Sequence, residues 1–238
     1  MKRTLAIIAA ALALVTGARA NDWFIGPFVR ESWTPLSLSP VAWYKGDGDA
    51  LDSSGTNNAA WVGDGNYTNG VNGQAFVTAN AKYIETPYLS YSSQFSWAAW
   101  IFPIGPHTGG YGGAYYDKYN ATRNRILSMD DGGLRLQFEI GVQDISWTAL
   151  PAGTIPTSAW THLGVVYDGS ALTVYRNGVA VTNMAASGNV NRLASAPCWI
   201  GRGYPTTYSF LGRLDDTLVF DRALTPAEIT RLYNWRQP

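Results

Sequence analysis

The chain places apolar and polar residues in short alternating runs over most of its length. From Val41 onward these runs are rich in Val, Ile, Trp, Tyr and Phe, and clusters of Gly, Asn and Asp separate them. Alternation with period two puts successive side chains on opposite faces of a strand. Many short strands with such turn residues between them predict an all-β antiparallel sandwich or barrel.

Several segments carry the strand pattern strongly. They are "VAWYKG" (41–46), "QFSWAAWIFPI" (94–104), "AYYDKY" (114–119), "NRILSM" (124–129), "LRLQFEI" (134–140) and "PCWIGRG" (197–203). The clearest is residues 159–182, where Asp168-Gly169 and Asn177-Gly178 mark the tight turns of a three-stranded meander. The Gly-, Asn- and Asp-rich stretch 46–73 predicts a loop with a short strand near Trp61.

One helix is expected, at "TPAEITRLYNW" (225–235). Thr225 stands at the capping position, Pro226 at the first helical position, and Glu228 completes a capping box. Ile229, Leu232 and Tyr233 share one face of such a helix, which predicts that it docks on the sandwich.

Asp215 and Asp216 stand side by side in the apolar strand "FLGRLDDTLVF" (210–220). Strict alternation directs them to opposite faces, with Asp216 in the apolar row and Asp215 in the row of Arg213. A buried carboxylate needs a partner, and a β-bulge near the pair would exchange the two roles.

The first 20 residues are typical of a secretory signal. Lys2 and Arg3 precede an apolar run, and Ala18-Arg19-Ala20 provides the small residues of a cleavage site after Ala20. A membrane anchor is the alternative, although the apolar run is short for a span. We expect a secreted or periplasmic chain with an extended lead-in at 21–37 and one domain at 38–238.

The composition and charge of the chain limit the classes of binding partner that we expect. Lys plus Arg and Asp plus Glu number 17 each, so the sequence predicts no nucleic-acid partner. No second long apolar run follows the signal, which predicts no membrane span in the mature chain. The lone Cys198 stands between apolar residues and predicts a buried thiol.

The order of these motifs resembles the laminin-G-like, concanavalin A-like lectin/glucanase superfamily in its secreted bacterial form. The resemblance covers residues 38–234 and rests on "WTHLGVVYDG", the "YRNG" hairpin and the "GRLDDTLVFDRALTPAEI" ending. It implies a two-sheet antiparallel jelly roll with one short C-terminal helix. An arginine often found in the last strand of the family is replaced by Leu218 here.

Hydrolases of that superfamily have a strand in which two carboxylates lie in phase. The nearest approach here is "EIGVQD" (139–144), where Gly141 replaces the central aspartate and, in one continuous strand, Glu139 and Asp144 would face opposite ways. His107 and His162 lack the partners of a metal cluster or a catalytic triad. We therefore predict no catalysis.

The resemblance also implies structural Ca²⁺. An aspartate at the position of Asp215 or Asp216 is similar to a calcium ligand in related jelly rolls, completed by the loop after the first strand. In this chain that loop contributes Asp49, Asp52 and Asn57, with Asp47 beside them, and their oxygens suit Ca²⁺. The alternative is that the carboxylates accept hydrogen bonds from loop amides and Arg213.

Exposed tyrosines suggest where a sugar binds, because an aromatic ring can pack on the apolar face of a sugar while polar side chains reach its hydroxyls. The candidate ligand-binding residues are Tyr111, Tyr115, Tyr116, Asp117, Tyr119, Asn120, Arg123, Arg202, Tyr204 and Tyr208. We expect about half of the tyrosines to pack inside, and Trp97, Trp100, Trp160 and Trp199 to lie in the core.

The sequence thus predicts a non-catalytic carbohydrate-binding domain whose partner is a glycan or polysaccharide. A surface adhesion or structural protein that binds protein partners is the alternative. A degenerate glycoside hydrolase that depends on Glu139 is a third reading.

Overall fold

The structure is a computed structural model of the 238-residue chain. It describes residues 33–91, 93–104, 112–118, 124–130, 133–140, 143–149, 154–190, 196–202 and 209–236. In the strands between 112 and 149 it describes the backbone and the side chains of residues 113–115. The chain divides into two compact units, Met1–Thr34 and Pro35–Pro238, and the second holds the β fold. The predicted signal sequence lies outside the described residues.

The larger sheet has eight strands among the described residues, in the order β13-β12-β11-β6-β15-β4-β3, with β1 paired to β15. Its strands are β1 (Ala42–Tyr44), β3 (Tyr67–Asn69), β4 (Gln74–Thr78), β6 (Phe95–Pro103), β11 (Thr161–Tyr167), β12 (Ala171–Arg176), β13 (Val179–Ala185) and β15 (Gly212–Phe220). Every pairing in this sheet is antiparallel.

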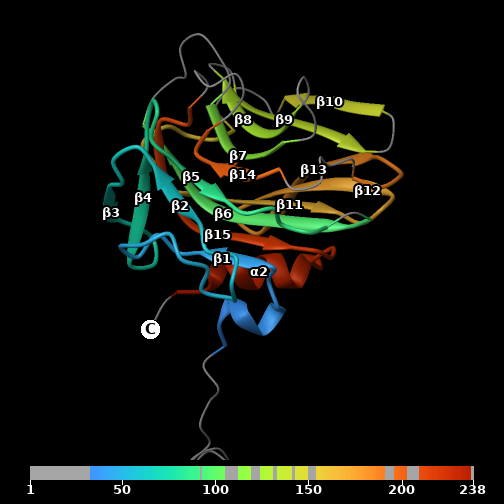
Figure 1. Ribbon diagram of the computed structural model, residues 1–238. Helices are drawn as coiled ribbons and strands as arrows, with labels where there is room; N and C mark the ends of the chain where they lie inside the picture. Colours follow the sequence, from blue (N-terminus) through green and yellow to red (C-terminus); the bar gives the residue numbers. More distant parts are fainter. Residues whose placement is uncertain are drawn as a thin grey trace, which may run out of the picture. The chain divides into compact units, whose positions relative to one another are not determined.

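The smaller sheet has seven strands among the described residues, in the order β10-β9-β8-β7-β14-β5-β2. Its strands are β2 (Ala60–Val62), β5 (Tyr83–Thr86), β7 (Gly112–Lys118), β8 (Asn124–Asp130), β9 (Gly133–Ile140), β10 (Gln143–Ala149) and β14 (Cys198–Ile200). All of its pairings are antiparallel as well. The expected two-sheet antiparallel jelly roll is confirmed, and Figure 1 shows the sheets as two layers of the second unit.

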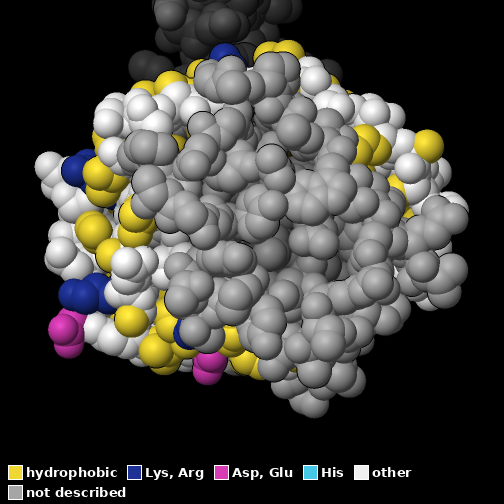
Figure 2. All heavy atoms as spheres, turned by 90° about the horizontal axis from the view of Figure 1, so that it is seen from above, with side chains coloured by type: hydrophobic (Ala, Val, Ile, Leu, Met, Phe, Trp, Pro, Cys, Tyr) yellow, Lys and Arg dark blue, Asp and Glu magenta, His cyan; other side chains and the backbone are white. Residues whose placement is uncertain are grey.

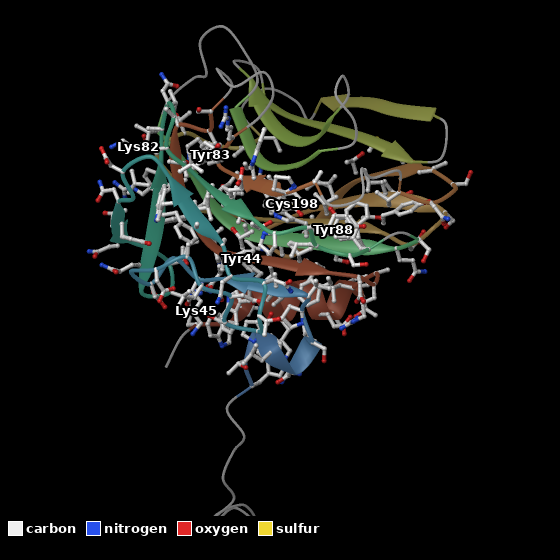
Figure 3. All side chains as sticks on the ribbon, viewed as in Figure 1. Tyr44, Lys45, Lys82, Tyr83, Tyr88 and Cys198 are labelled. Atoms are coloured by element: carbon white, nitrogen blue, oxygen red, sulfur yellow. The ribbon has the colours of Figure 1, made fainter. Side chains whose placement is uncertain are left out.

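The main core fills the space between the two sheets. Tyr44 from β1 and Cys198 from β14 belong to this core, and both are fully buried (Figure 3). Burial raises the pKa of Tyr44, while its hydroxyl donates to the Asn57 carbonyl at 2.7 Å. The thiol of Cys198 is therefore a packing group, as the sequence predicts.

Helix α2 (Pro226–Asn234) lies below β1 and β15, on the face of the eight-stranded sheet that points away from the other sheet (Figure 1). The predicted capping box is present, because the Thr225 side chain accepts from the Glu228 backbone while the Glu228 side chain accepts from the Thr225 backbone. An added Cβ at Gly164 would lie 3.2 Å from Ile229 Cδ1, so the bare glycine lets the helix approach β11 closely.

Aromatic rings fill the layer between α2 and this sheet. Trp100 packs on His162 at 5.2 Å and on Tyr233 at 5.5 Å between ring centroids. Trp43 meets Trp235 edge to face at 5.5 Å. The buried His162 is therefore a packing residue, and burial lowers its pKa to about 3.

The strand β15 does not keep the alternation that the sequence predicts. Its register against β6 shifts between Asp215 and Leu218, and Asp216 has a φ of +50°. A bulge inserts an extra residue and changes the phase of the strand. Leu214 and Val219 consequently share the main core, and the prediction that Asp215 and Asp216 serve opposite faces is wrong.

Two further predictions need correction. The strand near Trp61 is present as β2, but the stretch expected to be loop also contains β3. The segment around Glu139 is a pair of strands, β9 and β10, in which Glu139 and Asp144 are direct register partners.

The described part of the chain contains no helix with the length and apolar content that crossing a bilayer requires.

Truncation of Ile229 tests how much the helix contributes to stability. Ile229→Ala removes a fully buried side chain from the contact with Gly164, and we expect a loss of about 2–4 kcal/mol in the free energy of unfolding. Urea denaturation measures the loss. The exposed Arg231→Ala in the same helix is the control, with an expected change within about 0.5 kcal/mol. Equal losses in the two variants would contradict the proposed docking.

Candidate functional site

Asp215 and Asp216 are buried, with exposed fractions of 0% and 4%. Asp215 Oδ2 accepts from the Val71 backbone N–H at 2.6 Å and from that of Asn72 at 3.0 Å. Asp216 accepts from Trp43 Nε1 at 2.8 Å and from Asn72 Nδ2 at 2.6 Å. Both carboxylates therefore serve the turn between β3 and β4, and Asp216 also ties β1 to it.

The turn Gly70–Gly73 fits closely over these carboxylates. A side chain at Gly70 would collide with Asp215 Oδ2, and one at Gly73 would collide with Asp47 Oδ1. Asp47 Oδ1 also accepts from the Gln74 backbone N–H at 2.7 Å. Asp215 and Asp216 thus accept hydrogen bonds from the turn, and Asp47 accepts one from the residue that follows it.

The two adjacent carboxyl groups have perturbed acidity. Burial and the neighbouring charge of Asp216 raise the pKa of Asp215 to about 8. Burial also raises the pKa of Asp216, although the hydrogen bonds from Asn72 and Trp43 oppose that rise. At neutral pH the pair therefore favours holding one proton, unless a cation compensates the second charge.

The residues predicted as metal ligands in the first loop form a separate network. Asp52 Oδ1 accepts from the Trp43 backbone N–H at 2.9 Å and from Ser54, and its Oδ2 accepts from the Asn57 backbone N–H at 3.0 Å. Asn57 Nδ2 donates to the Val41 carbonyl. Asp49 Oδ1 accepts from the Leu51 backbone N–H. These side chains shape the loop, and their role as calcium ligands stays a prediction.

One atom of the pair fits a cation. Asp215 Oδ1 is buried and has no hydrogen-bond partner. Arg213, which the sequence offered as a partner, places its guanidinium 4.7 Å from the Phe102 ring centroid. The described residues contain no group of three or more His, Cys, Asp or Glu side chains that could hold a metal ion. Any cation at Asp215 would therefore depend on backbone or amide oxygens for further ligands.

A second candidate site lies on the outer face of the seven-stranded sheet. It consists of Tyr83, Glu85, Trp199 and Arg202, which we call the Trp199 cluster. Trp199 alternates in β14 with the fully buried Cys198 and Ile200, so its ring points away from the main core.

Charged groups hold the ring of Trp199 on two sides. Trp199 Nε1 donates to Glu85 Oε2 at 2.8 Å. The Arg202 guanidinium lies 4.7 Å from the Trp199 ring centroid and 4.3 Å from that of Tyr83, and the two rings meet edge to face at 5.8 Å. Figure 3 labels Tyr83 at its place on β5. In Figure 2, hydrophobic, basic and acidic side chains lie next to one another on the side of β2 and β4.

The predicted sugar-contacting residues are only partly described. Arg202 belongs to the Trp199 cluster, Tyr116 is the register partner of Trp199, and Asp117 is the register partner of Cys198. Tyr115 is 7% exposed and lies in the main core, so it is not an accessible ring. The other candidates fall outside the described residues: Tyr111, Tyr119, Asn120, Arg123, Tyr204 and Tyr208.

Sequence reasoning missed most of the Trp199 cluster. It assigned Trp199 to the core, whereas the structure makes it half-buried, and it made the same error for Trp160. Trp97 and Trp100 are buried as predicted. The alternation of "CWI" could have separated Trp199 from its buried neighbours.

The pairing of β9 with β10 changes the expected phase of Glu139 and Asp144. Glu139 and Asp144 are register partners on neighbouring strands, and register partners in a sheet share one face. The expectation that one continuous strand directs Glu139 and Asp144 to opposite faces therefore does not hold, because the two residues lie on separate strands.

Residues 73–230 match the family described as the Concanavalin A-like lectin/glucanases superfamily. This match covers more than half of the chain, and the chain belongs to that superfamily. The motifs at its C-terminal end therefore identified the family correctly. A search of curated protein sequences finds no match.

Solved structures with the same fold include several binding domains. Domain 4 of AbnA, a GH43 extracellular arabinanase from Geobacillus stearothermophilus, was solved in complex with arabinotriose. It is 25% identical with a TM-score of 0.70, over 82% of this chain and 98% of that one. The binding domain of Paraclostridial Mosquitocidal Protein 1 is 20% identical with a TM-score of 0.65, over 84% of this chain and 52% of that one.

The botulinum neurotoxin serotype D binding domain is 16% identical with a TM-score of 0.63, over 82% of this chain and 50% of that one. The chain spans about half the length of these two toxin domains, and at such identity they show the fold alone.

The raised pKa of Asp215 predicts a pH dependence of stability. The folded state holds the proton more tightly than the unfolded state, so stability falls as pH rises toward about 8. The lowered pKa of His162 acts in the opposite direction, but only below about pH 6.5. With chelator present, we expect the melting temperature to fall between about pH 6.5 and 8.

Asp215→Asn should remove this fall, because the amide oxygen still accepts from Val71 and Asn72 while no charge develops. Thermal melting across the pH range measures it, with the exposed Asp49→Asn as the control. Parallel curves for wild type and Asp215→Asn would contradict the assignment.

Proposed function

We propose that this protein is a secreted, non-catalytic carbohydrate-binding domain and that the Trp199 cluster contacts the sugar. The single observation that carries the proposal is the half-buried Trp199 ring, fixed between Glu85 and Arg202 on the outer face of a sheet. Secretion rests on the N-terminal sequence "MKRTLAIIAAALALVTGARA".

The chemistry of the cluster suits a sugar. Aromatic rings supply flat apolar area at low conformational cost, and a carboxylate and a guanidinium that contact the ring can bond hydroxyl groups. Because Glu85 and Arg202 hold the ring in place, little side-chain entropy remains to be lost on binding. Tyr116, the register partner of Trp199, is the neighbouring candidate contact.

The similar AbnA domain supports an oligosaccharide as the first ligand to test, since that domain was solved with arabinotriose. We therefore choose arabino-oligosaccharides as the first probe, followed by plant, algal and microbial polysaccharides.

Truncation of the ring tests the proposal. Trp199→Ala should weaken binding of the best oligosaccharide at least about tenfold, as expected for a central aromatic contact. Isothermal titration calorimetry measures the affinity. Trp160→Ala is the matched control, because Trp160 is a half-buried tryptophan that packs on Phe102 in the other sheet. Melting curves must show that both variants fold.

The alternatives give different results. If the wild type binds no glycan on a broad array, the sugar proposal is overturned and a surface adhesion protein with protein partners is favoured. Release of reducing sugar that disappears in Glu139→Gln would instead show a glycoside hydrolase. Equal weakening by Trp199→Ala and Trp160→Ala would place the contact elsewhere.

We also propose that Ca²⁺ binds at Asp215 as a structural ion. Its unpartnered Oδ1 supports this proposal, because a buried carboxylate oxygen without a donor is costly and a cation would compensate it. Asp216 is the adjacent carboxylate, and Asp47 adds further negative charge nearby. The ion would replace the shared proton and keep both carboxylates charged.

Calcium binding predicts a metal-dependent melting temperature. Millimolar Ca²⁺ should raise the midpoint of the wild type over that in chelator, by an amount that grows with the free ion concentration. Asp215→Asn should abolish the rise. Asp49→Asn changes a carboxylate of the first loop and leaves Asp215 and Asp216 intact, so it tests whether the first loop contributes to the ion site. No shift in the wild type would exclude the ion, and an undiminished shift in Asp215→Asn would place it elsewhere.

A further inference from the structure

We infer that the Trp199 cluster selects acidic glycans, and that Arg202 pairs with the carboxylate of a uronic acid residue. This inference rests on the proposed sugar-binding function and names the ligand class of the same site. It follows from the unusual surroundings of the Arg202 guanidinium.

Among the described residues, the Arg202 guanidinium is held by two aromatic rings and by no hydrogen-bond acceptor. Its Cζ lies 4.3 Å from the Tyr83 ring centroid and 4.7 Å from that of Trp199. Its Nε is buried and has no hydrogen-bond partner. Within the described residues, no carboxylate or carbonyl bonds the group. The rings fix the plane of the guanidinium, and because Nε is buried, the donors assigned to an external acceptor are the terminal nitrogens Nη1 and Nη2.

Other arginines of the chain show what an internal role looks like. Arg222 forms a two-point ion pair with Glu228 at 2.8 and 3.1 Å. Arg176 donates to the Thr154 carbonyl, and Arg236 donates to the carbonyls of Tyr233 and Trp235. Arg202 has ring contacts in place of such bonds. A planar guanidinium stacked on aromatic rings offers parallel donors to a carboxylate.

Glu85 decides which anion fits. It accepts a hydrogen bond from Trp199 Nε1, so the cluster carries one negative and one positive side chain. A dianion such as a phosphate monoester would gain from Arg202 but be repelled by Glu85. A uronic acid offers a single carboxylate for Arg202 and hydroxyl groups for Glu85. Its ring also has apolar C–H groups for the aromatic side chains.

The test compares charged and neutral oligosaccharides with the same backbone. The probes are oligomers of galacturonate, glucuronate, mannuronate and guluronate, together with their carboxyl-reduced counterparts. Calorimetry on the full mature chain should show that one uronate oligomer binds at least about tenfold more tightly than its reduced counterpart.

Arg202→Gln should lower the affinity for that uronate about 10- to 100-fold and leave the reduced oligomer unchanged, since glutamine keeps donors but no charge. Arg213→Gln is the matched control, because Arg213 stacks on Phe102 in the other sheet. Arg202→Lys should restore part of the charge effect without the two-point geometry. Melting curves check that each variant folds.

Equal wild-type affinity for charged and reduced oligomers overturns the inference, as does an equal loss of both in Arg202→Gln. Binding of arabinotriose without binding of any uronate overturns the acidic preference and leaves the proposed function standing. Absence of binding to every oligosaccharide removes both.

Discussion

The second unit depends on two adjacent carboxylates that are buried and hydrogen-bonded to the same short turn. Asp215 accepts from the backbone of Val71 and Asn72, and Asp216 accepts from the side chains of Asn72 and Trp43. Leaving these groups unpaired inside the protein would cost several kcal/mol, on the order of 2–7 for each polar group. The bonds therefore fix β15 to β1 and to the turn between β3 and β4. No single strand pairing joins all three.

The bulge in β15 makes this arrangement possible. With regular alternation, one carboxylate would point into the main core, where neither Asn72 nor Trp43 could reach it. The positive φ of Asp216 and the shifted register bring both side chains to one side. The same shift lets Val219 take a core position after Leu214. One local irregularity thus satisfies two polar groups and preserves the apolar packing on either side of them.

The sequence predicts local features of this fold well because their causes are local. Asn177 and Gly178 both adopt the positive φ that their hairpin turn requires, and Thr225 with Glu228 forms the capping box that the spacing indicates. The family resemblance supplied the two-sheet architecture. By contrast, the bulge at Asp216 arises from bonds to Asn72, which is 144 residues away in the chain. Period-two alternation cannot reveal such a requirement.

In the candidate site, too, features with local causes can be predicted from the sequence, and features that depend on neighbouring strands cannot. Arg202 stands out in sequence as a charge near tyrosines, but its contact with Tyr83 depends on the neighbouring strand β5. Trp199 was assigned to the core because it belongs to a strand motif, and motif membership does not say which face a side chain occupies. The strand β3 was missed for a similar reason, since its pairing with β4 overrides the weak strand preference of glycine- and asparagine-rich sequence.

Two tryptophans show how differently the outer faces of the two sheets are packed. Trp43 donates its indole N–H to the buried Asp216, and Trp235 packs against its ring. Trp199 donates to the half-buried Glu85, and a guanidinium and a tyrosine edge contact its ring. The first arrangement uses the ring to attach a helix and a strand. The second keeps a ring and a cation partly exposed in fixed positions, as the proposed sugar-binding role of this cluster requires for a low entropic cost.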